Sequence, residues 1–160
     1  KGEKKTSMKC ALTGHRRLPY NFSRETLSAE LEELVLKGTD TFYCGMAVGF
    51  DMEACMALLK LKKRYPLRVV ACVPCPEQDA KFTPAQRQLY HDLLDRCDEV
   101  NVISPSYSKD CMRKRNYYMV DRADFVYCYF SGNVRSGTYQ TIRYAQGKDR
   151  KIFAYGFTEQ

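Results

Sequence analysis

The sequence has no long hydrophobic run. Nowhere in its 160 residues does a stretch approach the roughly 18 consecutive apolar residues that a membrane-spanning helix needs. Its polar start, Lys1–Ser7, contains no apolar core of the kind found in a secretory signal peptide. We therefore expect neither a membrane protein nor a secreted one, and we expect a cytoplasmic location.

Two common nucleotide-binding fingerprints are also absent. The chain has no G-x-x-x-x-G-K-[ST] phosphate loop, and no G-x-G-x-x-G follows its first apolar run. Its second apolar run leads into Gly45, where a dinucleotide-binding enzyme would carry an acidic residue for the ribose. These absences exclude a P-loop NTPase and argue against a conventional nicotinamide-dependent dehydrogenase.

The eight cysteines are scattered through apolar stretches and form no Cys/His cluster. Free thiols in such stretches behave as small hydrophobic groups, which suits a reducing compartment. The one C-x-x-C pair, Cys72 and Cys75, has no second pair beside it, so we expect no metal site. Pro74 and Pro76 favour an extended segment here, whereas a redox pair would stand at a helix start.

The chain carries a moderate excess of positive charge. Its 26 lysines and arginines against 19 acidic residues give a formal net charge of +7. Part of this excess lies in residues 1–7, which we expect to form a flexible tail before a single domain over residues 8–160. Such a balance suits an anionic small molecule. No basic stripe is visible in the sequence, so nucleic acid is not expected as a partner.

Six short apolar runs alternate with longer amphipathic segments. The runs are rich in β-branched and aromatic residues with little polar alternation, which predicts strands buried on both faces. The segments between them have helical spacing, as in Leu27, Leu31 and Leu34. Parallel strands need helical crossovers, so the sequence predicts a three-layer α/β/α, Rossmann-like domain with about six mainly parallel strands. The predicted strands are Lys9–Thr13, Thr41–Cys44, Arg68–Val73, Val100–Ile103, Phe125–Phe130 and Lys151–Tyr155.

Three of the predicted strands run into turns that contain glycine. Open α/β sheets bind ligands at the carboxyl ends of their strands, and glycine lets backbone N–H groups approach an anion closely. Each turn has a second interpretation, because tight strand-to-helix connections need glycine in any case. Together the turns predict a phosphate or nucleotide site at one edge of the sheet. They are Thr13-Gly14-His15-Arg16, Gly45 to Asp51, and Ser131 to Thr138.

Four motifs occur in a fixed order between Met8 and Phe153. They are Thr13-Gly14-His15-Arg16, Gly45-x-x-x-Gly49-x-Asp51, Arg115-Asn116-x-x-Met119 and Ser136-Gly137-Thr138. This ordered set resembles the SLOG superfamily of Rossmann-like nucleotide-binding domains, in particular its YpsA-like (DUF1273) branch. The superfamily also contains the LOG phosphoribohydrolases, which release a base from a nucleoside monophosphate, and the DNA-processing protein DprA. The resemblance implies recognition of a nucleotide or of a nucleotide derivative.

The LOG signature, similar to M-x-x-R-K-x-x-M followed by G-G-x-G-T-x-x-E, is only partly matched. Arg115 stands at the arginine, Asn116 stands at the lysine, and Gly137-Thr138 matches the G-T pair. Gln140 and Thr141 replace the acidic pair. Cleavage of an N-glycosidic bond normally relies on carboxylates to activate water and to stabilise the developing positive charge. The sequence therefore favours binding over LOG-type hydrolysis.

Two hypotheses about function follow. The first is a domain that binds, and thereby senses, a nucleotide derivative such as ADP-ribose, NAD or a nucleoside phosphate. The second is an enzyme that processes the same ligands, with Asp51, Glu53 or His15 as acid or base. Binding of single-stranded DNA is a third class, which rests on analogy with DprA alone. No cofactor or metal is assigned, and homo-oligomerisation is left open.

Several candidate ligand-binding residues have two interpretations. Asp51 opens a helix, so it is either an N-cap or a ligand contact. Arg115 is either a solvent-facing helix charge or a contact to phosphate oxygens. His15 and Arg16 follow a strand and suit an anion, or they form a solvated turn. The full set of candidates is Thr13, Gly14, His15, Arg16, Gly45, Gly49, Asp51, Arg115, Asn116, Gly132, Ser136, Gly137 and Thr138.

Overall fold

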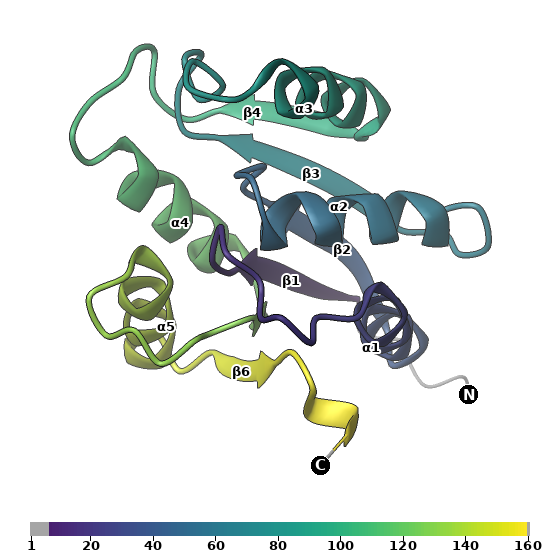
Figure 1. Ribbon diagram of the computed structural model, residues 1–160. Coiled ribbons are helices and arrows are strands. Elements are labelled where there is room, and N and C mark those ends of the chain that lie inside the picture. The colour runs from purple at the N-terminus through teal and green to yellow at the C-terminus, as the bar shows by residue number, and fades with distance from the viewer. Residues whose placement is uncertain (1–6, 160) are drawn as a thin grey trace.

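Six parallel strands form one sheet with the order β4-β3-β2-β1-β5-β6 (Figure 1). The computed structural model describes residues 7–159. The predicted tail therefore lies outside the described residues except for Ser7. The strands are β1 (Met8–Thr13), β2 (Thr39–Cys44), β3 (Arg68–Val73), β4 (Glu99–Val102), β5 (Phe125–Cys128) and β6 (Lys151–Ala154).

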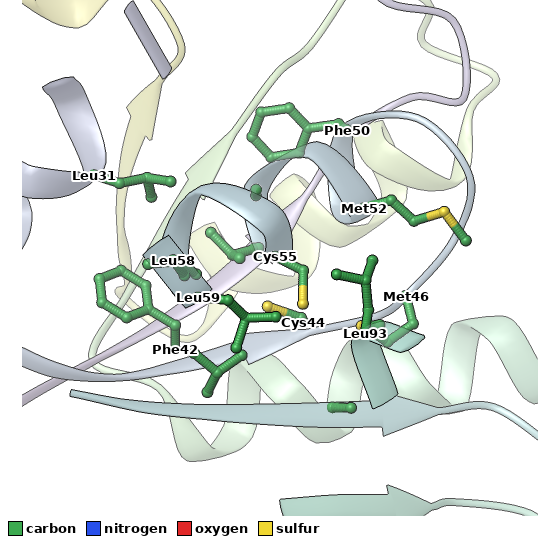
Figure 2. Packing of buried hydrophobic residues seen from close by; sticks show 14 of the residues in the cluster. Leu31, Phe42, Cys44, Met46, Phe50, Met52, Cys55, Leu58, Leu59 and Leu93 are labelled. Atoms are coloured by element: carbon green, nitrogen blue, oxygen red, sulfur yellow. The ribbon is translucent and has the colours of Figure 1, made fainter. Parts of the chain in front are cut away.

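Helices cover both faces of this sheet, which confirms the predicted three-layer fold. On one face, Phe42 and Cys44 of β2 pack with Cys55 and Leu58 of a helix and with Leu93 of another (Figure 2). The opposite face has its own buried cluster beneath two further helices. The first face carries α1 (Arg24–Leu36), α2 (Phe50–Leu61) and α3 (Pro84–Arg96); the second carries α4 (Cys111–Arg122) and α5 (Gly137–Gly147); a short 3-10 turn, η1 (Phe157–Glu159), follows β6.

The expectation that all strands are buried on both faces is wrong at the sheet edges. β5 is buried throughout, whereas Val100 and Val102 of β4 are 43% and 51% exposed. An edge strand has a neighbour on one side only, and β4 pairs with β3 alone. A continuous apolar run therefore does not by itself distinguish a central strand from an edge strand.

No helix within residues 7–159 is long and apolar enough to span a bilayer. The eight cysteines are all unpaired thiols, and seven of them are buried.

A buried carboxylate joins the first helix to the C-terminal segment. Glu30 of α1 is 0% exposed. Its oxygens accept hydrogen bonds from the Tyr127 hydroxyl at 2.7 Å, from the Gly156 amide at 2.8 Å, and from both the amide and the hydroxyl of Thr158 at 2.9 and 2.7 Å. A buried charge is tolerated when its lone pairs are filled in this way. This carboxylate therefore supplies the buried part of the contact that holds the chain after β6 against α1, beside the hydrogen bonds of Ser23 to Tyr155 and of Thr26 to Glu159.

Replacing Glu30 with alanine is expected to lower the free energy of unfolding by about 3–5 kcal/mol, because its buried donors would lose their acceptor. The matched control is Glu33→Ala, on the same helix, which removes only a partly exposed pair with Lys37 at 3.5 Å. That control should change the free energy by about 0.5 kcal/mol or less. Urea denaturation followed by circular dichroism measures both values, and equal losses would contradict this role of Glu30.

Candidate functional site

The three glycine turns lie at neighbouring carboxyl ends of the sheet. β1 pairs with β2 on one side and with β5 on the other, so the turns that follow these strands are adjacent. Strands β2, β3 and β4 lie to one side of β1, and β5 and β6 lie to the other. The point where the strand order reverses is therefore between β1 and β5, which is where open α/β sheets bind ligands.

His15, in the turn after β1, forms hydrogen bonds to both of the other glycine turns. Its carbonyl accepts the Phe50 amide at 3.1 Å, and its ring nitrogen Nε2 accepts the Ser131 amide at 3.0 Å. The ring also stacks on Phe130, with centroids 5.9 Å apart. Burial lowers the pKa of His15. An accepting Nε2 carries no proton, so the ring is neutral, and it positions the β5–α5 turn.

The glycines of the site fall into two groups. A Cβ on Gly14 would lie 2.5 Å from Phe50, and a Cβ on Gly49, where φ is +100°, would overlap the carbonyl of Arg16. These two glycines let the β1 and β2 turns pack together. Gly132 and Gly137 have nothing within 4 Å of such a Cβ. The β5–α5 turn is thus the one with free space around its glycines.

Arg115 and Asp51 meet at Gly45, and both side chains are buried, with 3% and 6% exposure. A Cβ on Gly45 would lie 2.8 Å from the guanidinium carbon and 2.9 Å from Asp51 Oδ2, so a side chain there would collide with both. The guanidinium donates to the Gly45 carbonyl, to the Cys72 carbonyl at 3.2 Å, and from Nε to Asn116 Oδ1 at 2.8 Å. The solvent-facing interpretation of Arg115 is therefore wrong: α4 directs it inward, where it joins the ends of β2 and β3.

Asp51 does not cap its helix, contrary to the N-cap interpretation. Gly49 is the N-cap of α2 and Asp51 is its second residue. Asp51 Oδ2 accepts the Ala47 amide at 3.3 Å, and Oδ1 is buried without a partner among the described residues. Burial raises the pKa of Asp51 to about 6, although the Arg115 charge and the Ala47 N–H both act to lower it. Burial likewise lowers the pKa of Arg115.

A cleft of about 470 Å³ opens over the carboxyl ends of β1, β2 and β3. This volume falls within the range of small-molecule sites, which are mostly apolar with a few placed polar groups. Its walls follow that description: apolar side chains predominate, and the polar ones are Gln78, the acidic Glu77 and the basic Arg16 and Lys81. The lining residues are Arg16, Ala47, Pro74, Cys75, Glu77, Gln78, Ala80, Lys81, Phe82, Tyr107, Cys111 and Met112.

The β5–α5 turn borders a shallower hollow of about 340 Å³. Ser136 is the N-cap of α5: its hydroxyl accepts the Tyr139 amide at 3.1 Å and donates to the Asn133 carbonyl at 2.7 Å. The amides of Gly137 and Thr138, at the start of α5, have no hydrogen-bond partner within residues 7–159. Unpaired amides at a helix N-terminus are the groups that bind anions.

A third hollow adjoins the hollow at α5. It is lined by Lys109, Asp110, Arg113 and Gln140, and Gln140 also lines the hollow at α5. Its other lining residues flank Cys111 and Met112, which line the cleft. Six basic side chains line the three hollows, against two acidic ones; we call these six the basic rim. The basic rim consists of Arg16, Lys81, Lys109, Arg113, Arg135 and Arg143.

Of the candidates from the sequence, the structure places Arg16, Ser136 and Gly137 on the hollows. Thr13 and Thr138 are buried at the end of β1 and at the start of α5. The candidate set lacks Gln78, Phe82 and Tyr107, which lie in loops that carry no glycine motif, and it lacks most of the basic rim. Counting basic residues in all turns after strands, rather than seeking a run, would have found Lys81, Lys109 and Arg135. It would not have found Arg113 and Arg143, which lie on α4 and α5.

Residues 10–157 match the YpsA family model, described as the YspA SLOG family. The SPbeta prophage-derived protein YoqJ of Bacillus subtilis (strain 168) is 29% identical over 137 residues, covering 77% of this chain and 80% of YoqJ. A UPF0398 protein of Halalkalibacterium halodurans is 26% identical over 113 residues, covering 69% of this chain and 59% of that protein. The resemblance inferred from the motifs is confirmed.

Two solved structures of DNA processing protein A (DprA) have a similar fold, one from Streptococcus pneumoniae and one from Helicobacter pylori. Each gives a TM-score of 0.67 at 19% identity and covers 92% of this chain. The chain spans 50% of the first DprA chain and 64% of the second. At this identity the likeness shows the fold alone.

The expectation that nucleic acid is not a partner of a domain like this one is wrong. The Helicobacter pylori DprA structure is described by its single-stranded DNA binding mode, so a protein of this fold does bind nucleic acid. The expectation rested on the lack of a basic run in the sequence. In the folded chain, the basic rim gathers charges from separate turns and from the helices α4 and α5.

Asp51 gives the site a testable pH dependence. Its folded pKa of about 6 lies above the ordinary value of 3.8, so between these values the folded state holds a proton that the unfolded state has released. The contribution of Asp51 to the free energy of unfolding is therefore largest below about pH 4, falls as the pH rises, and is constant above about pH 6 to 7.

The stability difference between the wild type and Asp51→Asn should change by roughly 3 kcal/mol between about pH 4 and pH 7, in the direction that disfavours the wild type at high pH. Urea denaturation at several pH values measures this difference. The substitution also removes the negative charge beside Arg115. This loss shifts the stability difference by a similar amount at every pH, so it does not produce the expected pH dependence. A difference that stays constant with pH would contradict the burial of an ionisable Asp51.

Proposed function

Because this chain belongs to the YspA SLOG family, we propose that it binds a nucleotide or a nucleotide derivative at the carboxyl edge of its sheet. The observation that carries this proposal is that two chemically different hollows are lined by residues that follow the carboxyl ends of the strands. One is a mostly apolar cleft of about 470 Å³, and the other is a basic hollow at the start of α5. A nucleotide has two corresponding parts, a flat base with apolar faces and an anionic phosphate.

The phosphate is assigned to the β5–α5 turn. The amides of Gly137 and Thr138 are unpartnered, and the helix dipole adds positive potential at this position. Arg135 and Arg143 line the same hollow and supply charge-assisted hydrogen bonds to phosphate oxygens. The Ser136 hydroxyl caps the helix, so its contribution is to hold these amides in place.

Binding without turnover is the form of the proposal that the geometry supports best. The three acid–base candidates are each engaged away from the cleft. Asp51 is buried at Gly45, Glu53 pairs with Arg24 at 2.7 Å, and His15 holds the Ser131 amide. At the positions of the LOG acidic pair, Gln140 is exposed and the hydroxyl of the buried Thr141 donates to the Gly137 carbonyl at 2.8 Å. We therefore propose a ligand-sensing domain for ADP-ribose, NAD or a nucleoside phosphate.

Gly137→Glu is expected to abolish the binding of nucleotide probes while the protein still folds. Nothing lies within 4 Å of a Cβ at Gly137, so the side chain fits, but its carboxylate repels the phosphate. A ligand at 100 times its dissociation constant stabilises a fold by about 2.7 kcal/mol, which is roughly 5–11 °C in melting temperature for a chain of this size. Thermal shift with AMP, ADP-ribose and NAD measures this increase, and the variant should lose it.

The control is Gly147→Glu, at the other end of the same helix, where a Cβ also meets nothing within 4 Å. It should keep the full ligand-induced shift. If Gly137→Glu keeps the shift as well, the phosphate binds elsewhere, and the Gly45–Asp51 turn becomes the better candidate.

Single-stranded DNA is the second candidate ligand. The observation that favours it is the basic rim, which extends beyond the cleft along all three hollows, on a fold shared with DprA. Tyr107 and Tyr139 lie on the same surfaces and offer rings for base stacking.

Fluorescence anisotropy with labelled strands of about 12 nucleotides tests this second candidate. If the basic rim binds the strand, log K should fall linearly with log salt, with a slope of about −0.7 per phosphate contacted. Exchanging Arg135 and Arg143 for glutamine should reduce the magnitude of this slope by about 1 to 2. No rise in anisotropy at low salt would exclude DNA as the ligand.

A further inference from the structure

Gln78 carries a side-chain amide into the lining of the cleft, and the protein holds both polar atoms of this amide by hydrogen bonds. It lies in the loop between β3 and α3 and lines the cleft. Its Nε2 donates to the Gly45 carbonyl at 3.0 Å, and its Oε1 accepts the Tyr90 hydroxyl at 3.1 Å. Tyr90 is 3% exposed, so this support is buried.

The support fixes which way the amide points. Gly45 presents a carbonyl oxygen, which accepts hydrogen bonds only, so Nε2 has to face it. A flipped amide would set Oε1 against that oxygen and leave two acceptors in contact. The Gly45 carbonyl is held in turn by the buried guanidinium of Arg115. The side chain of Gln78 is therefore locked in one orientation through three buried or half-buried groups.

A locked amide still has hydrogen-bonding capacity to offer. Nε2 carries two hydrogens and Oε1 two lone pairs, and the protein uses one of each. The amide thus retains one donor and one acceptor. Glutamine pairs in this way with adenine, donating to a ring nitrogen and accepting from the exocyclic N6 amino group.

The rest of the cleft favours adenine over other bases. The walls of the cleft include Ala47, Pro74 and Phe82, which provide no hydrogen-bonding side chain, and Glu77, whose Oε1 already accepts the Tyr107 amide at 2.8 Å. Guanine carries a second exocyclic group, an amino group at C2, and cytosine carries a carbonyl at C2. Burying such a group against apolar walls without a partner costs free energy. Adenine has N6 as its only exocyclic polar group.

We propose that Gln78 recognises an adenine base in this cleft, so that the ligand of the domain is an adenine nucleotide. This inference rests on the proposed function and names the ligand class for the same site. Arg16 and Lys81 line the same cleft and add positive charge beside such an anionic ligand, whose phosphate is assigned to the β5–α5 turn. The adenine belongs either to a free nucleotide or to a nucleic-acid strand, and the experiment separates these sources.

The experiment compares the affinities of AMP and IMP by isothermal titration calorimetry. IMP replaces the N6 amino group with an oxygen and is otherwise similar in size. The wild type should bind AMP about 5- to 150-fold more tightly than IMP. Gln78→Met keeps the length of the side chain and removes both polar atoms, so it should weaken AMP binding by about the same factor and abolish the preference.

Two further variants complete the design. Gln88→Met makes the same change at an exposed position on α3 outside the cleft and should leave both affinities unchanged. Tyr90→Phe removes the donor to Oε1 and keeps the Gln78 amide, so it should reduce the preference without abolishing binding. If Gln78→Met fails to fold, the ratio of the AMP and IMP affinities, measured for the wild type and for Tyr90→Phe, still tests the inference.

Adenine and thymine homo-oligonucleotides of about 12 nucleotides identify the source of the base. An adenine strand that binds more tightly than both the thymine strand and AMP indicates recognition of adenine within a strand; tighter binding of AMP than of either strand indicates a free nucleotide. A wild type without preference for AMP, or a Gln78→Met variant that keeps it, would overturn the inference while leaving nucleotide binding intact. A wild type that binds none of the probes would overturn the proposed function, and the inference with it.

Discussion

The candidate site depends on one buried charge, the guanidinium of Arg115. It lies where the carboxyl ends of β2 and β3 meet α4, and it donates to the carbonyls of Gly45 and Cys72. A buried charge without partners would cost several kcal/mol, so the surrounding chain is constrained to supply them. Asp51 provides the opposite charge, and Gly45 lacks a side chain because one would collide with both groups. The β2–α2 turn is therefore shaped by the need to satisfy this arginine.

One side of the site is rigid and the other is open. On the rigid side, the Gly45 carbonyl also accepts a hydrogen bond from Gln78 Nε2, and His15 connects the β1, β2 and β5 turns. On the open side, the Cβ position of Gly137 has free space around it, and the amides of Gly137 and Thr138 are unpartnered. A site that is held firmly at one side and open at the other can admit a ligand without rearranging its support, which reduces the entropy cost of binding.

Periodicity was sufficient to predict the architecture, because strands buried in a parallel sheet and amphipathic helices leave different patterns. All six strands and the three layers were predicted in this way, but the exposure of β4 was not, since an edge strand can carry the same apolar residues. The family resemblance likewise followed from short motifs in order. Predictions for individual side chains were less successful. Arg115 sits among charged residues on its helix, and only the packed fold shows that it points inward.

The errors share a physical origin, which is that contacts between distant segments do not leave a local pattern. Asp51 looked like a helix cap, but in the fold it lies beside Arg115, which comes from α4. The basic rim was invisible because its members are separated by up to 127 residues, from Arg16 to Arg143. Gln78 has no motif at all, and its two hydrogen bonds connect three separate parts of the chain.

The central claim is that the carboxyl edge of the sheet binds a nucleotide, and backbone and side-chain amide NMR during a titration with AMP tests it most directly. The account predicts that the largest chemical-shift changes occur at the amides of Gly137 and Thr138 and at the side-chain amide of Gln78. Changes confined to a distant surface, such as the groove between α1 and α2 lined by Arg24 and Lys60, would contradict it.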